Sequence, residues 1–164
     1  MITKYSKLAK KNVTGGYLAL SLHPEDAEIL YSCVKKLKLK DVILPEDYHV
    51  TVMFDEFNPD ITVNKENFPE EFKADIDSIL ILGSGKWEAI TLLLDNCKEL
   101  HDFFKYLTRL GFKHSYYTFT PHISIKYQPT REDVNTVKKQ LLFLLKEAGL
   151  KTIRLQKIRQ EILK

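Results

Sequence analysis

The sequence is poor in cysteine and has no long apolar stretch, and both shortages exclude classes of protein. Its two cysteines, Cys33 and Cys97, cannot form the framework of paired bridges typical of small secreted domains. The first twelve residues are basic but lack the apolar core of a secretory signal. The longest apolar runs, such as residues 141–145, are too short to span a bilayer. We therefore expect a cytoplasmic protein without membrane contact.

An excess of one charge is also missing, although the charges are unevenly distributed. The 25 Lys and Arg residues nearly balance 22 Asp and Glu residues, giving a formal charge of +3. This surplus is too small to indicate a protein that coats nucleic acid. Residues 55–77 are acidic, whereas the first 11 residues and the tail from residue 151 are basic, which favours an anionic ligand on one face. With 164 residues, the chain is expected to form one domain, residues 1–164.

Periodicity predicts alternating strands and helices. The segments with the apolar runs or period-two alternation of strands are residues 17–22, 48–54, 72–82, 87–95 and 121–127. The segments with helical spacing are residues 24–38, opened by Pro24, residues 97–110, with Asn96 and Glu99 as a capping box, and residues 130–148, capped by Thr130 and Asp133. Residues 55–71 are predicted to be a long connection. For the tail, residues 150–163, we expect a bulged strand rather than a short helix.

The two strands that contain histidine have the same alternation. In the first, we expect Tyr48, Val50, Val52 and Phe54 on one face, and His49, Thr51 and Met53 on the other. In the second, we expect Ile123, Ile125 and Tyr127 on one face, and His122, Ser124 and Lys126 on the other. Each histidine is thus followed two residues later by a hydroxyl on the same face.

The strand, the helix and the histidine strand repeat at one spacing. A shift of 73 residues carries His49 onto His122 and Thr51 onto Ser124. The same shift also matches apolar positions of the preceding strand and helix: Tyr17 with Ile90, Leu20 with Leu93, Leu30 with Phe103 and Val34 with Leu107. Two repeats indicate a pseudo-twofold pair of lobes rather than a solenoid. The lobe motifs span about residues 15–55 and 87–128, followed by a C-terminal helix and strand over residues 130–163.

This pairing of residue types suits the cleavage of a phosphodiester. Imidazole has an ordinary pKa near 6.5, so one histidine can remove a proton near neutral pH while another donates one. The hydroxyls of Thr51 and Ser124 can donate to phosphoryl oxygens, where negative charge builds in the transition state. His49, Thr51, His122 and Ser124 are therefore the candidate catalytic residues.

Candidate substrate-binding residues lie near these strands. Lys126, expected on the face of His122, could add positive charge. Aromatic rings offer stacking surfaces for bases, and the candidates are Tyr17, at the start of the first strand, and Tyr116, Tyr117 and Phe119, in the segment before His122. Trp87, in a strand-like run, is expected in the core.

These motifs resemble the 2H (two-histidine) phosphoesterase superfamily, whose mark is a pair of His-x-Thr/Ser-x motifs with apolar x. His49-Val50-Thr51-Val52 and His122-Ile123-Ser124-Ile125 both fit. Within it, residues 15–128 look most like the phage anti-CBASS nucleases, which degrade cyclic oligonucleotide signals of bacterial immunity. The resemblance is carried by residues 17–20 (YLAL), 44–51 (LPEDYHVT) and 120–127 (TPHISIKY).

The resemblance implies a bilobal α/β (α+β) fold in which antiparallel sheets flank a central cleft, with helices outside. It also implies hydrolysis of 3′,5′ linkages in cyclic di- or trinucleotides without metal or other cofactor, through a 2′,3′-cyclic phosphate. The partner would be this small nucleotide, with no obligate protein partner. A phage-encoded chain would act in the host cytoplasm.

Other functions remain open from the residues. RNA ends with a 2′,3′-cyclic phosphate or a 2′-5′ linkage need the same two histidines. A module that binds nucleotide or RNA without turnover would also use a basic bilobal cleft. A metal site at His49 and His122, completed by His101, His114 or Asp55, lacks the usual ligand spacing. A Cys–His nucleophile is disfavoured because neither cysteine has an activating neighbour in sequence.

Overall fold

The computed structural model describes residues 14–164, so the lysines of the N-terminal segment lie outside the described residues. Its strands are β1 (Tyr17–Leu22), β2 (His49–Phe54), β3 (Glu71–Leu82), β4 (Ala89–Asp95), β5 (His122–Tyr127) and β6 (Thr152–Glu161). Its α-helices are α2 (Pro24–Lys35), α3 (Lys98–Leu110) and α4 (Arg131–Glu147). Short 3-10 turns occupy Pro45–Asp47, Lys65–Asn67 and Gly85–Trp87. The predicted order of strands and helices is confirmed.

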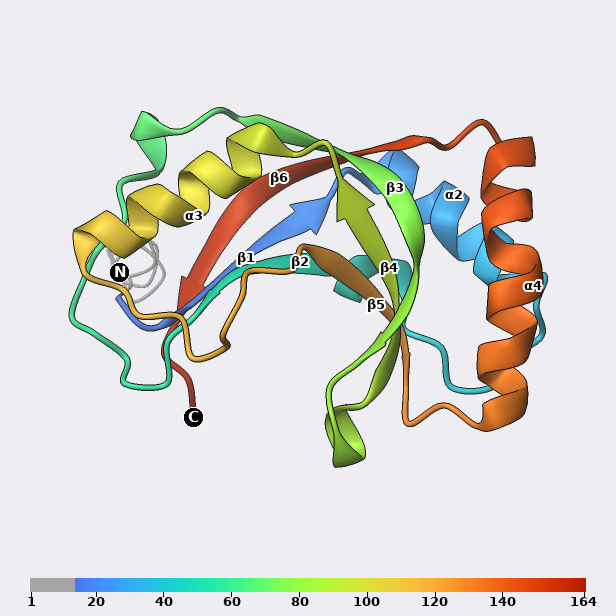
Figure 1. The fold of residues 1–164 in the computed structure, drawn as a ribbon. Coiled ribbons are helices and arrows are strands. Elements are labelled where there is room, and N and C mark those ends of the chain that lie inside the picture. Colours follow the sequence, from blue (N-terminus) through green and yellow to red (C-terminus); the bar gives the residue numbers. More distant parts are fainter. Residues whose placement is uncertain (1–13) are drawn as a thin grey trace, which may run out of the picture.

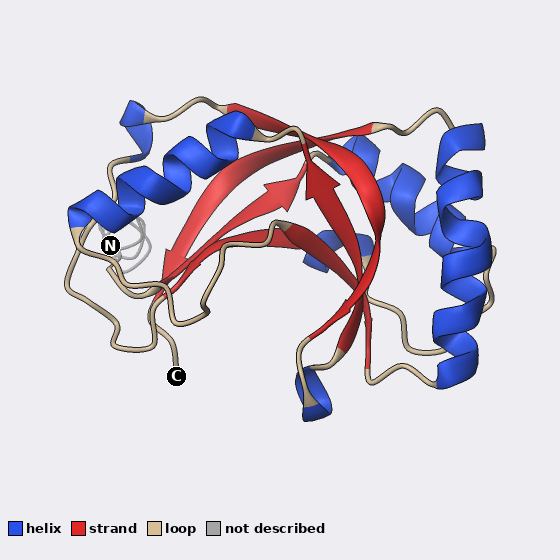
Figure 2. Cartoon of the chain, viewed as in Figure 1, coloured by secondary structure: helices blue, strands red, loops and turns tan. Residues whose placement is uncertain are grey.

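The six strands form one antiparallel sheet with the order β2-β1-β6-β3-β4-β5. Each lobe contributes three strands, β2-β1-β6 and β5-β4-β3, so the predicted bilobal α/β architecture is confirmed. The pairing of β6 with β3 joins the lobes into one continuous sheet. The sheet is strongly curved (Figures 1 and 2), and its two edge strands, β2 and β5, contact each other. The strands that begin with the two histidines therefore meet.

The C-terminal segment is a strand, as predicted, and it includes a bulge. Ile153 and Leu155 are buried, while pairing with β1 shifts register between Ala19 and Ser21. Lys157 has a positive φ of 56° within this stretch, as expected for an irregular strand.

An ion pair between β6 and α2 fixes the start of this strand. The carboxylate of Asp26, which is buried, accepts hydrogen bonds from the backbone N–H and the guanidinium of Arg154 at 2.8–3.1 Å. Such charge-assisted, forked contacts are strong and directional. They hold β6 against the helix of the first lobe.

The helix ends follow the predicted caps with one exception. Thr130 and Asp133 form the expected capping box at α4, and Pro24 opens α2, which ends at Lys35 rather than at residue 38. The capping box predicted for Asn96 is wrong, because Cys97 is the N-cap of α3 and makes no side-chain cap. The Asn96 side chain instead donates to the Asp75 carboxylate of β3 at 2.9 Å, so a tertiary partner replaces the local one.

The helices cover one face of the sheet and bury alternate strand residues there. In Figure 2 the helices lie outside the curved sheet at its two ends, and Figure 1 shows α3 at one end and α2 with α4 at the other. The residues at the centre of this core are Leu18, Leu20, Val50, Val52, Ile90, Leu92, Ile123 and Ile125 from strands and Leu30, Leu100, Leu107 and Leu141 from helices. No helix within residues 14–164 has the length and apolar character needed to cross a membrane.

We predict that Tyr48→Phe raises the free energy of unfolding by about 1 kcal/mol. Tyr48 is 2% exposed, and its hydroxyl has no hydrogen-bond partner within the described part of the chain. Burial likewise raises the pKa of Tyr48. Removing a buried, unsatisfied hydroxyl recovers its desolvation cost while the ring stays packed. Urea denaturation measures the change, with Tyr117→Phe, an exposed hydroxyl, as the neutral control. A loss of stability in Tyr48→Phe would contradict the prediction.

Candidate functional site

The two histidines occupy equivalent places at the starts of the two edge strands. In each strand the histidine and the hydroxyl are partly exposed, while the residue between them is fully buried. Val50 and Ile123, the residues between, face the core beneath the helices. His49 with Thr51 and His122 with Ser124 therefore lie on the face that the helices leave uncovered, as predicted.

A backbone carbonyl orients each imidazole in the same way. The Nδ1 atom of His49 lies 2.8 Å from the carbonyl oxygen of Asp47, and that of His122 lies 2.6 Å from the carbonyl oxygen of Thr120. A carbonyl can only accept, so in both rings Nδ1 carries a proton and donates it. In the neutral ring Nε2 then has the free lone pair, and in the protonated ring it has the proton to give.

The rings are close enough to affect one another electrostatically. Burial lowers the pKa of His122 below its ordinary value of 6.5; the Thr120 carbonyl opposes this shift, and the charge of His49 adds to it. The neutral form of His122 is therefore favoured at neutral pH. The contact between β2 and β5 brings the two strands, and hence the two motifs, together.

Tyr17 and Arg159 extend the site on the first lobe. The hydroxyl of Tyr17 lies 3.2 Å from Thr51 Oγ1, and its ring is 6.5 Å edge-on from the His49 ring. The guanidinium of Arg159, on β6, lies 5.8 Å from the centre of the Tyr17 ring. Only the general basicity of the tail pointed to Arg159 in the sequence, because its placement depends on the pairing of β6 with β1.

In each histidine strand, a bulge after the hydroxyl residue reverses the faces of the sheet to which the following side chains point. Leu18 pairs with Met53 and Ala19 with Thr51, which leaves Val52 as the extra residue. In the other lobe Ile90 pairs with Lys126 and Thr91 with Ser124, which leaves Ile125 as the extra residue. A bulge of this kind turns the following side chains to the opposite face.

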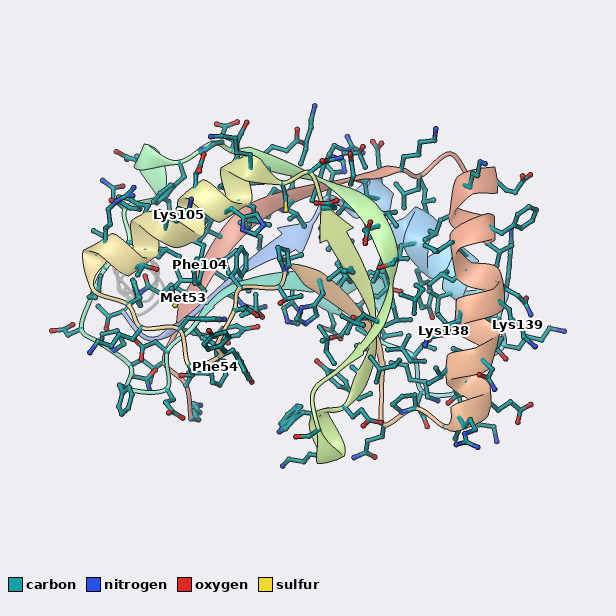
Figure 3. All side chains as sticks on the ribbon, viewed as in Figure 1. Met53, Phe54, Phe104, Lys105, Lys138 and Lys139 are labelled. Atoms are coloured by element: carbon teal, nitrogen blue, oxygen red, sulfur yellow. The ribbon has the colours of Figure 1, made fainter. Side chains whose placement is uncertain are left out.

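The predicted faces of the last two residues in each strand are therefore wrong. Met53 is fully buried, and Figure 3 shows it on the side of Phe104, with Phe54 on the other side of the strand. Tyr127 corresponds to Phe54 in the second lobe. Strict period-two alternation could not reveal this reversal, since the sequence does not mark where the bulge falls.

Lys126 is consequently directed away from the histidine face. It is 7% exposed, its Nζ donates to the backbone carbonyl of Lys40, and it lies 3.3 Å from the Asp133 carboxylate. The expectation that it adds charge beside His122 is corrected, because its ammonium group is already paired inside the protein.

The candidate aromatic residues differ in their surroundings. Tyr116 is exposed, and its ring lies 5.3 Å from the Phe54 ring, whereas Tyr117 is fully exposed. Phe119 is stacked on Phe104 of α3 at 4.6 Å, so it packs against the core. Phe54 in turn lies 6.4 Å from the Tyr17 ring, which makes Tyr17, Phe54 and Tyr116 a continuous aromatic row.

Trp87 is in a different environment from the one predicted. It lies in the turn before β4, is 64% exposed, and its ring is 5.9 Å edge-on from that of Tyr127. Its expected place in the core is therefore wrong. Each lobe thus has a partly exposed aromatic cluster beside its histidine strand, and the sequence did not indicate Phe54, Trp87 or Tyr127 as members.

The strand pairing also corrects the internal repeat by one residue in its first strand. Phe54 pairs with Tyr17, and its counterpart Tyr127 pairs with Ala89. Tyr17 therefore corresponds to Ala89 rather than to Ile90, while the shift of 73 holds for the histidine strands. The Tyr17 hydroxyl beside Thr51 consequently has no counterpart beside Ser124.

The other groups considered from the sequence do not assemble at the histidines. Within residues 14–164, no cluster of three or more His, Cys, Asp or Glu side chains could hold a metal ion. Cys33 and Cys97 are free and buried, and burial raises the pKa of both thiols.

Two surface concavities lie away from the histidines, one beside Phe68 and β6 and the other between β3 and α4. The predicted cleft between the histidines stays a prediction.

The chain is similar to known proteins over most of its length. The family described as "Anti-CBASS protein Acb1" matches residues 14–151, most of the chain. The chain belongs to the Acb1 family. Among curated relatives, an Acb1 of Vibrio phage KVP40 is 24% identical over 113 residues, which cover 69% of this chain and 72% of the phage protein. Membership of the Acb1 family implies a role in evading the CBASS immunity of a host.

We predict that the His122 imidazole titrates below pH 6.5. Because burial disfavours its charged form, the folded protein holds His122 neutral over a wider pH range than the unfolded chain does. Its contribution to stability is therefore lost as pH falls below about 6.5 toward the lowered folded pKa. Two-dimensional NMR of the imidazole nitrogens measures the midpoint. A His122 midpoint at or above the ordinary value of 6.5 would refute the assignment.

Proposed function

We propose that this chain is a metal-independent phosphodiesterase of the 2H type that hydrolyses 3′,5′ phosphodiester bonds of cyclic di- or trinucleotide signals. The observation that carries the proposal is the matched orientation of two histidines, each with Nδ1 on a carbonyl and a hydroxyl two residues away. Membership of the Acb1 family supports the role in phage evasion of CBASS. The host cytoplasm is then the place of action.

The first step is an attack by the ribose 2′-hydroxyl on the adjacent phosphorus. One histidine accepts the 2′-hydroxyl proton at Nε2 as the O2′–P bond forms. The P–O5′ bond breaks, and the second histidine gives its Nε2 proton to the leaving O5′. The product is a linear nucleotide with a 2′,3′-cyclic phosphate. In a second step the second histidine takes a proton from the attacking water, the P–O2′ bond breaks, and the first histidine returns its proton to O2′, which restores both imidazoles.

We assign His122 as the base of the first step and His49 as the acid. A base must be neutral when substrate arrives, and burial lowers the pKa of His122, which keeps it neutral at lower pH. The contact of His49 with its carbonyl is exposed, whereas that of His122 is part-buried, so bulk water can replace a proton that His49 gives away. The assignment follows from this difference in environment, because the carbonyl contacts of the two rings are alike.

The hydroxyls of Thr51 and Ser124 are proposed to stabilise the developing negative charge. Each lies on the same face as its histidine and can donate to a non-bridging oxygen of the phosphorane. The Tyr17 hydroxyl at 3.2 Å from Thr51 restricts the rotation of the threonine hydroxyl. The arrangement needs no metal ion to neutralise the phosphate charge.

The two aromatic clusters are proposed to hold the bases. Tyr17, Phe54 and Tyr116 form one surface, and Trp87 with Tyr127 forms the other. Stacking on rings accepts any base, so these surfaces bind a nucleotide on each side of the scissile bond without strict sequence readout. RNA ends and non-catalytic nucleotide binding remain the rival functions, and a substrate panel separates them.

We predict that turnover of cyclic oligonucleotides survives EDTA and is lost in His49→Ala and His122→Ala. Each variant lacks one proton-transfer group, so kcat is expected to fall at least about 100-fold while ligand still binds. The panel comprises cyclic dinucleotides, cyclic trinucleotides and RNA ends, followed by chromatography of products. His101→Ala, which removes an exposed histidine of α3, is the matched control. Preferred turnover of RNA ends would replace the proposed substrate, and undiminished turnover in either variant would exclude the mechanism.

We predict that Trp87→Leu raises KM about 10-fold and leaves kcat nearly unchanged, because losing one stacked base costs about 1–3 kcal/mol of binding. Steady-state kinetics on the preferred cyclic substrate measures both constants. Phe143→Leu, an exposed aromatic on α4, makes a comparable change away from the histidines. Equal effects of the two variants on KM would contradict a base-binding role for Trp87.

A further inference from the structure

Each histidine strand ends by holding the loop that leads into the other histidine strand. We propose that Lys126, near the end of β5, is a positioning residue for His49 and that Asp55, directly after β2, is a positioning residue for His122. The catalytic consequence of this inference rests on the proposed function, whereas the positioning itself does not.

We call a contact crossed when a strand of one lobe holds a loop of the other lobe. The first crossed contact runs from β5 to the loop before β2. The Lys126 ammonium donates to the carbonyl of Lys40, and the carbonyl of Ile125 accepts from the Ile43 N–H at 2.9 Å. The nearby Asp133 carboxylate compensates the buried lysine charge. Ile125 and Lys126, three and four residues after His122, therefore fix the loop of the other lobe at two points.

The loop fixed in this way contains Asp47, whose carbonyl orients His49. Directly after Ile43, the turn Pro45–Asp47 is closed by a bond from the Asp47 N–H to the Leu44 carbonyl at 2.9 Å. The Asp47 carbonyl then accepts from His49 Nδ1. A tight turn transmits displacement because it has few torsions to absorb it, so movement at Ile43 is expected to move the carbonyl at Asp47.

The second crossed contact runs from the end of β2 to the loop before β5. The Asp55 carboxylate accepts from the Lys113 N–H at 2.8 Å with one oxygen and from the Phe57 N–H at 3.1 Å with the other. The carbonyl of Phe54 accepts from the Ser115 N–H at 2.7 Å. Here too, adjacent residues after the histidine motif fix the opposite loop at two points.

This loop contains Thr120, whose carbonyl orients His122. Four residues lie between Ser115 and Thr120, whose carbonyl accepts from His122 Nδ1. The next carbonyl, that of Pro121, accepts from the Leu94 N–H at 3.1 Å, so the loop is held at both ends. The two crossed contacts thus have the same plan, with a charged residue of one lobe anchoring the approach to the histidine of the other.

The cost of burying these charges argues that they have this specific role. Asp55 and Lys126 are both buried, and an isolated buried charge is strongly unfavourable unless it is paired and hydrogen-bonded. Both are bonded to backbone groups of the opposite loop. At the position in β2 that corresponds to Lys126, the chain has Met53, which packs in the core. The fold accepts an apolar residue there, so packing alone does not require the lysine.

The test is the NMR spectrum of the two imidazoles in Lys126→Met and Asp55→Asn. We expect Lys126→Met, which installs the residue found in the other lobe, to perturb the Nδ1–H signal of His49 and to leave that of His122 in place. This outcome is distinctive because Lys126 shares a strand with His122. For Asp55→Asn we expect the reverse, a perturbed His122 signal and an unchanged His49 signal. In each variant kcat should fall about 10-fold or more at nearly constant KM, because misplaced groups lose rate rather than binding.

Lys139→Met, the same replacement on the exposed surface of α4, is the control for lost charge, and it should leave both histidine signals unchanged. Lys139 lies on the outer side of α4 in Figure 3. If Lys126→Met does not fold, Lys126→Gln, which keeps a shorter donor, decides the same question. A folded variant in which only the same-strand histidine responds, or in which neither responds, overturns the proposal. Because the signals are read without substrate, this failure is distinct from a failure to find phosphodiesterase activity.

Discussion

The pairing of β6 with both β1 and β3 is the constraint on which the rest of the structure depends. β1 and β2 form one half-sheet, β3 to β5 form the other, and β6 pairs with a strand of each. The contact of Asp26 with Arg154 fixes the register at which β6 enters. With the lobes joined on one side, the curvature of the sheet brings the free edges together on the other. Those edges are the strands that begin with His49 and His122.

The sequence contained enough information for the local elements and the catalytic candidates. Alternation and caps predicted the strands and most helix ends, because these depend on near neighbours such as Thr130 and Asp133. The repeat of His49 and Thr51 at His122 and Ser124 indicated the duplicated motif. Asn96 does not cap α3 because Asp75, 21 residues away, binds its side chain. Local pattern cannot weigh a partner that only the fold brings near.

The bulges explain most of what the sequence did not reveal. Val52 and Ile125 look like ordinary members of alternating strands, yet each is the extra residue of its pair. The displaced alternation puts Phe54 and Tyr127 on the histidine face and sends Lys126 into the interior. The apolar run after Trp87 predicts a core position for its ring, whereas the strand starts only at Ala89. Such errors arise from register, which depends on pairing with another strand.

The lobes have the same architecture, but the surroundings of their two motifs differ. A reaction that uses one histidine as proton donor and the other as proton acceptor would need such a difference. Tyr17 supports Thr51 in one lobe, while Ala89 leaves Ser124 without an equivalent hydroxyl. Two identical half-sites would place the same acidity on both sides of a phosphorus atom. Here burial of His122 breaks the equivalence, so the duplicated scaffold can support opposite tasks on its two sides.

The loops that lie along β2 and β5 also bear on how this chain behaves at high concentration. The outer backbone groups of a terminal strand are a template for recruiting a strand from a neighbouring molecule, and this is a route to aggregation. Here the carbonyls of Phe54 and Ile125 are already engaged by Ser115 and Ile43 of the same chain. The two edge strands contact each other, and part of the backbone of each is already hydrogen-bonded within the chain. Few free backbone groups are therefore left to pair with a strand of another molecule.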